Sequence, residues 1–245
     1  MQSHWSLFKI VNLEENHRQG DDKTYADILK IICFGDQTKK DIETLEKRVR
    51  PKNHPDLKDP DAIHLFGKNK PVDEMNKKRI FKIPGEEFVI EAKTFHSTMK
   101  KFKPPVSKTG AINNTPFQAK LVLKVRAKIM LTYNVNTADG LTTGARGELI
   151  GVIKNDSGNI KKLIIKFENP VHGQMQREMQ ECEIGIQYPG GTIIEKITFG
   201  FSLSKLKKGS IATAKVVQFP VRLAFATTAH KIQGQTVKKT KESYC

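Results

Sequence analysis

The chain has 245 residues, of which 38% are hydrophobic, and its formal net charge is +16 at pH 7. That length can bury the core of one or two domains, but no apolar run is long enough to cross a membrane, so we expect no membrane partner. The cysteines at 33, 182 and 245 form no C-x-x-C pair, which indicates neither a disulfide framework nor a zinc knuckle.

The positive charge is concentrated in two tracts. Nine Lys or Arg residues and no acid lie between Ala92 and Ala138, and ten with a single acid lie between Lys196 and Cys245. The remainder of the chain is slightly acidic. This asymmetry favours a polyanionic partner, most simply nucleic acid, over the alternative of a lysine-rich soluble surface.

The first third of the chain alternates strand-like and helical patterns. Residues Trp5–Leu13 predict a strand, and Asp21–Phe34 predict an amphipathic helix that Gly35 ends. A second helix is expected to begin at Thr38, with Asp41 completing a capping box. We interpret the apolar stripes of both helices as core. A strand is then expected at Ala62–Phe66, and a helix from Asn69 onward that includes Met75 and Ile80. Another strand is expected at Glu87–Ala92.

The middle of the chain predicts a loop followed by short strands. Residues Thr94–Pro116 are basic and rich in Pro, Ser, Thr and Asn, which is typical of a loop. Leu121–Tyr133 predicts one strand, and Asp139-Gly140 a turn. Short strands separated by turns suggest a small barrel. Further strands are expected at Glu148–Lys154 and Ile160–Phe167, which together form a hairpin, and at Ile193–Phe201.

The most informative stretch is Gln218–Val237, QFPVRLAFATTAHKIQGQTV. Its first half is apolar on both faces, which predicts one buried strand of an α/β sheet. A short helix then carries Thr228, His230 and Lys231 and is expected to end at Gly234. Hydroxyls and free amides at such a turn suit a phosphate. The alternative is a strand, a cap and a surface loop without chemistry.

This stretch resembles the fifth motif of Pif-type DNA helicases, the RecD-like branch of superfamily one. The matching pattern is T-x-H-K-x-Q-G-x-T. Two other segments are similar to the same family: LKVRAKIML followed by DGLTTGARG, and the strand-following Leu13, Asn16 and Arg18 of the fourth motif. The fifth-motif residues here are Thr228, His230, Lys231, Gln233, Gly234 and Thr236.

The resemblance implies an α/β fold, namely an incomplete second RecA-like domain with an inserted SH3-like β-barrel, the 2B domain. Residues 1–144, with the basic loop 94–116, and residues 212–245 would form the RecA-like part, and residues 145–211 the barrel. It implies single-stranded DNA contact by Thr228, His230 and Lys231, and nucleotide contact by Gln233, Gly234 and Thr236. Arg18 becomes a candidate arginine finger, although a lone arginine after a strand is more often a solvated charge.

Two residues depart from the family pattern, since Arg126 replaces the usual Gly and Thr143 the usual Asn. Because arginine disfavours positive φ, we expect the turn at Arg126 to differ from that of the family. Beyond Val237 the chain reads KKTKESYC where the family continues with Y-V-A-x-S-R.

The sequence lacks the groups that hold ATP in such enzymes. It contains no G-x-x-x-x-G-K-[ST] run, and Val72-Asp73-Glu74 makes no Walker B motif because Lys68, Asn69, Lys70 and Pro71 precede it. The chain thus resembles the C-terminal fragment of a Pif-type ATP-dependent helicase, and its sequence resembles the copies carried by Helitron-type transposons. The family uses ATP and Mg²⁺, but we expect neither to bind stably to this chain alone.

The expected partners are single-stranded DNA and a missing N-terminal RecA-like domain, and the expected location, by family analogy, is the nucleus. Two alternatives stay open. Instead of a helicase fragment, the chain could be a non-enzymatic basic module that binds single-stranded nucleic acid, or a non-functional transposon relic.

We predict that this chain alone hydrolyses no ATP, because it lacks a P-loop to hold phosphate and magnesium together. The measurement is phosphate release with and without single-stranded DNA. DNA-stimulated turnover that persists through stringent purification would contradict the prediction.

Overall fold

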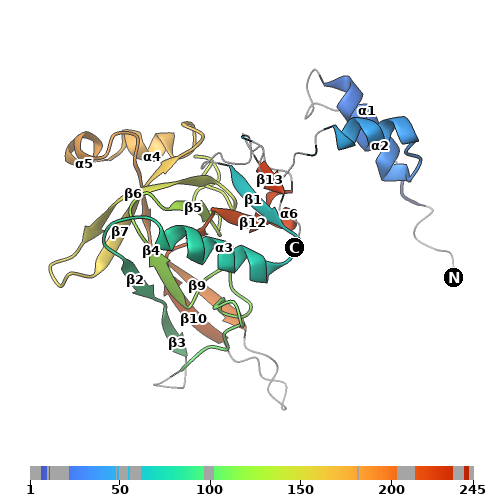
Figure 1. Cartoon of the computed structure of the whole chain (residues 1–245). Helices are drawn as coiled ribbons and strands as arrows, with labels where there is room; N and C mark the ends of the chain where they lie inside the picture. The colour runs from blue at the N-terminus through green and yellow to red at the C-terminus, as the bar shows by residue number, and fades with distance from the viewer. Residues whose placement is uncertain are drawn as a thin grey trace, which may run out of the picture. The chain divides into compact units, whose positions relative to one another are not determined.

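The computed structural model describes residues 7–9, 11, 22–47, 49, 55, 62–96, 102–180, 182–202, 213–233 and 240–242. The chain divides into two compact units, Met1–Asp59 and Pro60–Cys245, whose elements are labelled in Figure 1. No helix in the described ranges has the length and apolar character needed to traverse a bilayer.

The first helix of the first unit, α1 (Lys23–Phe34), follows its predicted capping signals. The Asp22 carboxylate accepts the backbone N–H of Tyr25 at 3.1 Å, which satisfies one of the free donors at the helix start. The helix ends at Gly35, whose φ of 79° forms a left-handed cap. Of its apolar residues, Ile28 alone is buried.

The second helix, α2 (Lys39–Glu46), begins with the expected capping box, in which the side chains of Thr38 and Asp41 each accept the other's backbone N–H. Its apolar stripe is not core, because Ile42 is 43% exposed and Val49, beyond the helix, is 73% exposed. The prediction that both helices bury their stripes is therefore wrong for most of these positions.

The predicted strand at Trp5–Leu13 lies mostly outside the described residues. Residues 7–9 and 11 are described and form no strand, and their apolar side chains are exposed. Arg18, the candidate arginine finger, lies outside the described residues, so its role stays a prediction.

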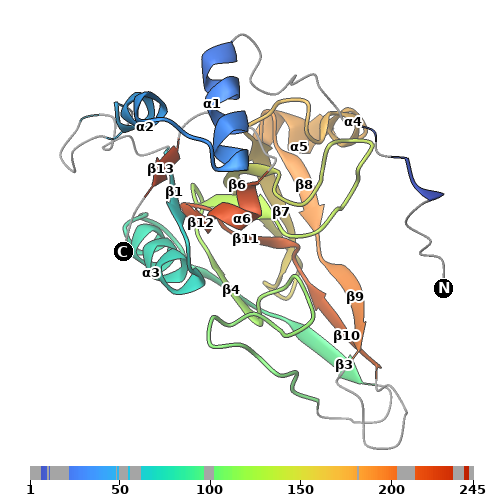
Figure 2. The same cartoon turned by 90° about the vertical axis from the view of Figure 1, so that its right-hand side faces the viewer.

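The second unit contains a small parallel sheet with a helix packed on it. Strand β1 (Ile63–Phe66) lies between β12 (Ala226–Thr228) and β13 (Thr240–Glu242) and is parallel to both. Helix α3 (Asn69–Phe81) follows β1, and in Figures 1 and 2 it runs alongside this sheet. The predicted strand and helix are confirmed here, and the contact buries Phe66, Val72 and Ala226.

An antiparallel five-stranded sheet forms the centre of the second unit. Its order is β11 (Val221–Leu223), β5 (Lys128–Leu131), β6 (Arg146–Lys154), β7 (Ile160–Phe167) and β8 (Thr192–Glu195). Every neighbouring pair in it is antiparallel, and β6 and β7 form the hairpin that the sequence predicts. Strand β11 is far from β5 in sequence, yet the two strands pair directly in this sheet.

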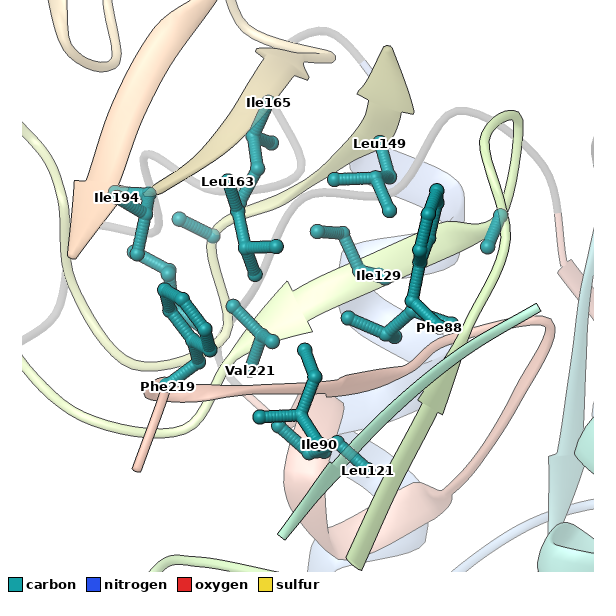
Figure 3. Close-up of a cluster of buried hydrophobic side chains, with 14 of the residues drawn as sticks. Phe88, Ile90, Leu121, Ile129, Leu149, Leu163, Ile165, Ile194, Phe219 and Val221 are labelled. Carbon is teal, nitrogen blue, oxygen red and sulfur yellow. The ribbon is translucent and has the colours of Figure 1, made fainter. Parts of the chain in front are cut away.

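The main core lies between this sheet and a two-stranded ribbon of β2 (Phe88–Glu91) and β4 (Lys120–Leu123). Figure 3 shows their side chains pointing toward one another, and Phe219 and Val221 close the same cluster. Burying a large aliphatic or aromatic side chain contributes roughly 1.5–3 kcal/mol, so this cluster is the main source of stability for the unit. The labelled members also include Phe88, Ile90, Leu121, Ile129, Leu149, Leu163, Ile165 and Ile194.

A further antiparallel sheet has the order β3 (Lys93–His96), β10 (Thr213–Gln218) and β9 (Ile197–Ser202). In both views it extends away from the five-stranded sheet, at the end opposite α4 and α5. Its inner face packs on a second cluster that contains Ile112 and Phe117. The predicted loop at Thr94–Pro116 is therefore wrong at its start, where β3 pairs with β10.

Three segments that predict single strands are each divided between two sheets. Leu121–Tyr133 forms β4 and β5, and Ile193–Phe201 forms β8 and β9. The apolar run after Gln218 forms β11 and β12, with breaks at Pro220 and at Ala224-Phe225. Proline has no N–H to donate to a ladder, which explains the first break. Apolar patterning predicts burial here but not which sheet receives each strand.

The five-stranded sheet is open in the described residues, because its edge strands β11 and β8 do not pair with each other. A closed barrel is therefore not observed. Strand pairing also crosses both predicted limits of the insertion, since β5 precedes residue 145 and β11 follows residue 211. The α/β character of the chain is observed.

Two short helices between β7 and β8 were not predicted, α4 (Gln174–Glu178) and α5 (Cys182–Gln187). The buried carboxylate of Asp139 accepts the backbone N–H groups of Met175 and Gln176 at 2.9 and 3.0 Å. A carboxylate satisfies free donors at a helix start, and this one lies more than 30 residues away in sequence. No local pattern could predict that cap.

The turn between β4 and β5 keeps a positive φ despite the arginine. Arg126 has a φ of 73°, and its N–H donates to the Leu149 carbonyl at 2.7 Å. The expectation that arginine would change this turn is therefore wrong. The tertiary hydrogen bond holds the backbone in a conformation that costs an L-residue roughly 1–2 kcal/mol.

We predict that Arg126→Gly raises the melting temperature by about 2–4 °C, because glycine adopts positive φ without the steric cost and the arginine side chain is exposed. The neighbouring Val125→Gly, at an ordinary φ, should lower it. Thermal unfolding followed by circular dichroism tests both, and a lower melting temperature for Arg126→Gly would contradict the strain argument.

Candidate nucleic-acid interface

The T-x-H-K residues lie where β12 passes into the one-turn helix α6 (Ala229–Ile232). The register of β12 with β1 aligns Thr228 with Phe66, so the carboxyl ends of the two parallel strands are level. Each strand is followed by a helix, α6 after β12 and α3 after β1. The carboxyl edge of a parallel sheet is where α/β folds place binding residues.

Strand β12 is held on its other side by a single side chain of α3. The Asn76 amide donates to the Ala226 carbonyl at 3.1 Å, and its oxygen accepts the Ala226 N–H at 2.9 Å. Asn76 is 5% exposed, so both bonds are shielded from water. The amide thereby pairs with the strand edge as a neighbouring strand would, and it fixes the segment that carries the motif.

The motif side chains differ in exposure. Thr228 is 6% exposed and adopts the extended N-cap conformation, but its hydroxyl does not cap α6. Thr227 is 1% exposed, and its hydroxyl has no hydrogen-bond partner among the described residues. His230 and Lys231 are exposed. The structure therefore presents His230 and Lys231 at the surface, above two buried threonines.

Two charged side chains from other elements lie beside Lys231. Desolvation lowers the pKa of the Lys231 ammonium, the charge of Arg222 on β11 lowers it further, and Asp73 on α3 opposes both. Burial lowers the pKa of Arg222, against the influence of Asp73. Desolvation also raises the pKa of the Asp73 carboxyl, whose Oδ2 has no hydrogen-bond partner in the described part of the chain. Three cations, namely Arg222, Lys231 and Lys77, thus act on one partly desolvated carboxylate.

Sequence reasoning missed Asp73, Asn76 and Arg222 as parts of this site. One signal was present, because Arg222 is the single charge in the apolar run from Phe219 to Phe225, and a charge there must reach solvent or a partner. Asp73 and Asn76 lie about 150 residues upstream and carry no comparable signal.

The remaining candidates are not brought into this site by the structure. Gly234 and Thr236 lie outside the described residues, and Gln233, which is described, is exposed at the end of α6. Their assignment to nucleotide therefore stays a prediction. In the described ranges no group of three or more His, Cys, Asp or Glu side chains is arranged to hold a metal ion.

No family model matches the chain. Its sequence is 26% identical over 234 residues to the ATP-dependent DNA helicase Pif1 of Bdellovibrio bacteriovorus, which covers 95% of this chain and 43% of that protein. It is 24% identical over 221 residues to the helicase PIF1 of Danio rerio, covering 90% of this chain and 29% of the relative. The chain is thus similar in sequence to Pif1-type DNA helicases. It spans less than half the length of each of these relatives.

Solved Pif1 structures share the fold. A Bacteroides Pif1 in complex with ADP-AlF4 matches 93% of this chain with a TM-score of 0.59 and 17% identity, and the match covers 44% of that chain. Pif1 of Candida albicans matches 93% with a TM-score of 0.59 and 20% identity, covering 48% of that chain. A Bacteroides Pif1 in complex with ADP-AlF3 and single-stranded DNA matches 96% with a TM-score of 0.57 and 19% identity, over 46% of its own length.

We predict that Asn76→Ala destabilises the second unit by about 2–4 kcal/mol, because it leaves the buried N–H and C=O of Ala226 unpaired. Glu74→Ala, at an exposed position of the same helix, should cost less than about 0.5 kcal/mol. Urea unfolding measures both, and equal losses in the two variants would show that the amide does not hold β12.

Proposed function

We propose that this chain is the C-terminal part of a Pif-type ATP-dependent DNA helicase and that it contacts single-stranded DNA through Thr228, His230 and Lys231. In this proposal residues 1–144 and 212–245 belong to an incomplete second RecA-like domain, and residues 145–211 to an inserted SH3-like 2B domain. DNA unwinding belongs to the parent protein, and this chain supplies part of its strand-binding surface.

The main observation in support is the position of the T-x-H-K motif at the carboxyl edge of the β1–β12 pair, where His230 and Lys231 are exposed. Arg222 adds a second cation beside Lys231. These groups suit phosphates better than bases, because hydroxyls and positive charge are present and neither β12 nor α6 carries a Phe, Tyr or Trp ring for stacking.

Nucleotide chemistry in the proposal requires the N-terminal RecA-like domain, which this chain does not supply. ATP, with Mg²⁺, would supply the phosphoryl transfer that drives strand separation, and Gln233, Gly234, Thr236 and Arg18 of this chain would face it. This chain's own contribution is to hold the strand through Lys231 and its neighbours. Localisation to the nucleus is part of the same proposal, and relatives from Danio rerio and Xenopus laevis are compatible with it.

A second candidate function is a non-enzymatic module that binds single-stranded nucleic acid. The absence of a P-loop from the sequence favours it as the behaviour of this polypeptide alone. Both functions require strand binding at the same motif, so one experiment tests what they share. A relic without function would bind no strand at all.

We predict that the chain binds single-stranded DNA with a salt slope of roughly −3, as expected when ~4 phosphates are neutralised. Lys231→Ala should flatten the slope by about 0.7, one phosphate's share, and should weaken binding to all sequences alike. Fluorescence anisotropy at several salt concentrations measures the slope.

The control is Lys39→Ala, an exposed lysine on α2 that the proposal leaves out. Circular dichroism first establishes that each variant is folded. Salt-independent binding, or equal losses from Lys39→Ala and Lys231→Ala, would overturn the proposal.

A further inference from the structure

A cavity of about 330 Å³ lies at the turn of the β6–β7 hairpin, away from the T-x-H-K motif. It is lined by Lys93 from β3, by Lys161 from β7 and by Lys196, which links β8 to β9. Asn155, Asn159 and Glu195 also line it. Three lysines from distant parts of the chain therefore line one cavity.

The ammonium groups of these three lysines form no hydrogen bond or ion pair with any described residue. The one carboxylate in the lining, Glu195, lies 3.4 Å from the Nζ of Lys162, which is not part of the lining. Desolvation lowers the pKa of Lys196, and the charge of Lys93 lowers it further, so the two ammonium groups repel each other. A bound anion would relieve that repulsion.

The ammonium group of Lys196 is also held in place by an aromatic ring. Its Nζ lies 5.1 Å from the centre of the Phe219 ring, and Phe219 is fully buried. The face of an aromatic ring attracts a cation, which holds the ammonium at the cavity wall. A fixed cation loses less conformational entropy on meeting a ligand than a free lysine does.

The cavity continues onto one face of the β3–β10–β9 sheet. Lys93 shares this face with Phe95, because side chains two residues apart on a strand point the same way. The register places Lys215 opposite Phe95 and also opposite Gly200, and Phe95 is 54% exposed. We call this face of the β3–β10–β9 sheet the outer face. Its exposed residues are Lys93, Phe95, Thr198, Gly200, Ser202, Thr213 and Lys215.

We propose that the lysine cavity and the outer face form a second binding surface for single-stranded nucleic acid, in which the cavity takes a backbone phosphate and Phe95 stacks on a base. Positive charge without a paired acid suits phosphate. An exposed ring beside lysines suits an unpaired base, because duplex bases are not free to stack on it. The proposal takes its ligand class from the function proposed above, but its residues are different ones.

Gly200 allows a test that spares the fold. A side chain added there meets no atom within 4 Å, and its φ is not in the left-handed region. Gly200→Glu places a negative charge on the outer face and should weaken single-strand binding several-fold, whereas Gly200→Lys should strengthen it and steepen the salt slope by about 0.7. Binding that is equal in both variants would overturn the proposal.

Lysine footprinting of the unmodified chain gives an independent readout. Acetylation rates measured by mass spectrometry should fall at Lys93, Lys161 and Lys196 when single-stranded oligothymidine is added. Lys166, exposed on the same strand as Lys161 but outside the cavity, is the matched control. Protection of Lys166 equal to that of Lys161, or full protection by duplex DNA of the same length, would count against the surface.

Variants of the two surfaces separate the two proposals. If Lys231→Ala flattens the salt slope while Gly200→Glu and Lys161→Gln behave as wild type, this inference fails and the proposed function stands. If the reverse holds, the motif footprint fails and the second surface stands. If the second surface stands, Phe95→Ala should weaken binding about five- to tenfold, as expected for loss of one stacked base. If this inference fails, Phe95→Ala should bind as wild type does.

Discussion

The amide of Asn76 is the contact on which the site depends. It joins residues 150 positions apart and supplies both hydrogen bonds that the outer edge of β12 would otherwise lack. Leaving buried backbone groups unpaired is expensive, so the strand holds its register against β1 only while α3 is docked. The positions of Thr228, His230 and Lys231, and the proximity of Asp73 to Arg222 and Lys231, follow from that docking.

The same chain segment connects this site to the main core and to the second surface. After β10 pairs with β3 and β9, Phe219 enters the core, β11 joins the five-stranded sheet and β12 joins the parallel sheet. The Phe219 ring lies under Lys196, while Arg222, three residues later, lies beside Lys231. One strand-rich segment therefore supports cations on two separate surfaces, and both are stabilised by the burial of its apolar neighbours.

Relatedness to Pif1-type helicases and the local geometry explain different aspects of the protein. The similarity to solved Pif1 structures accounts for the fold, and these proteins extend well beyond the part that this chain matches. The geometry accounts for which cations are partly desolvated, which hydroxyls are buried and where positive charges meet without a counter-ion. The proposed phosphate binding at either surface rests on these local properties, because electrostatic attraction strengthens as water is excluded.

The sequence by itself determined the local features of this protein. The caps of α1 and α2, the β6–β7 hairpin, the α/β character and the T-x-H-K motif all follow from residue types at short spacing. Only the tertiary structure decided the division of three apolar runs between sheets, the positive φ of Arg126, the Asp139 cap of α4 and the Asn76 pairing with β12. Each of these depends on partners that are distant in sequence, and apolar patterning specifies that a residue is buried without specifying what it is buried against.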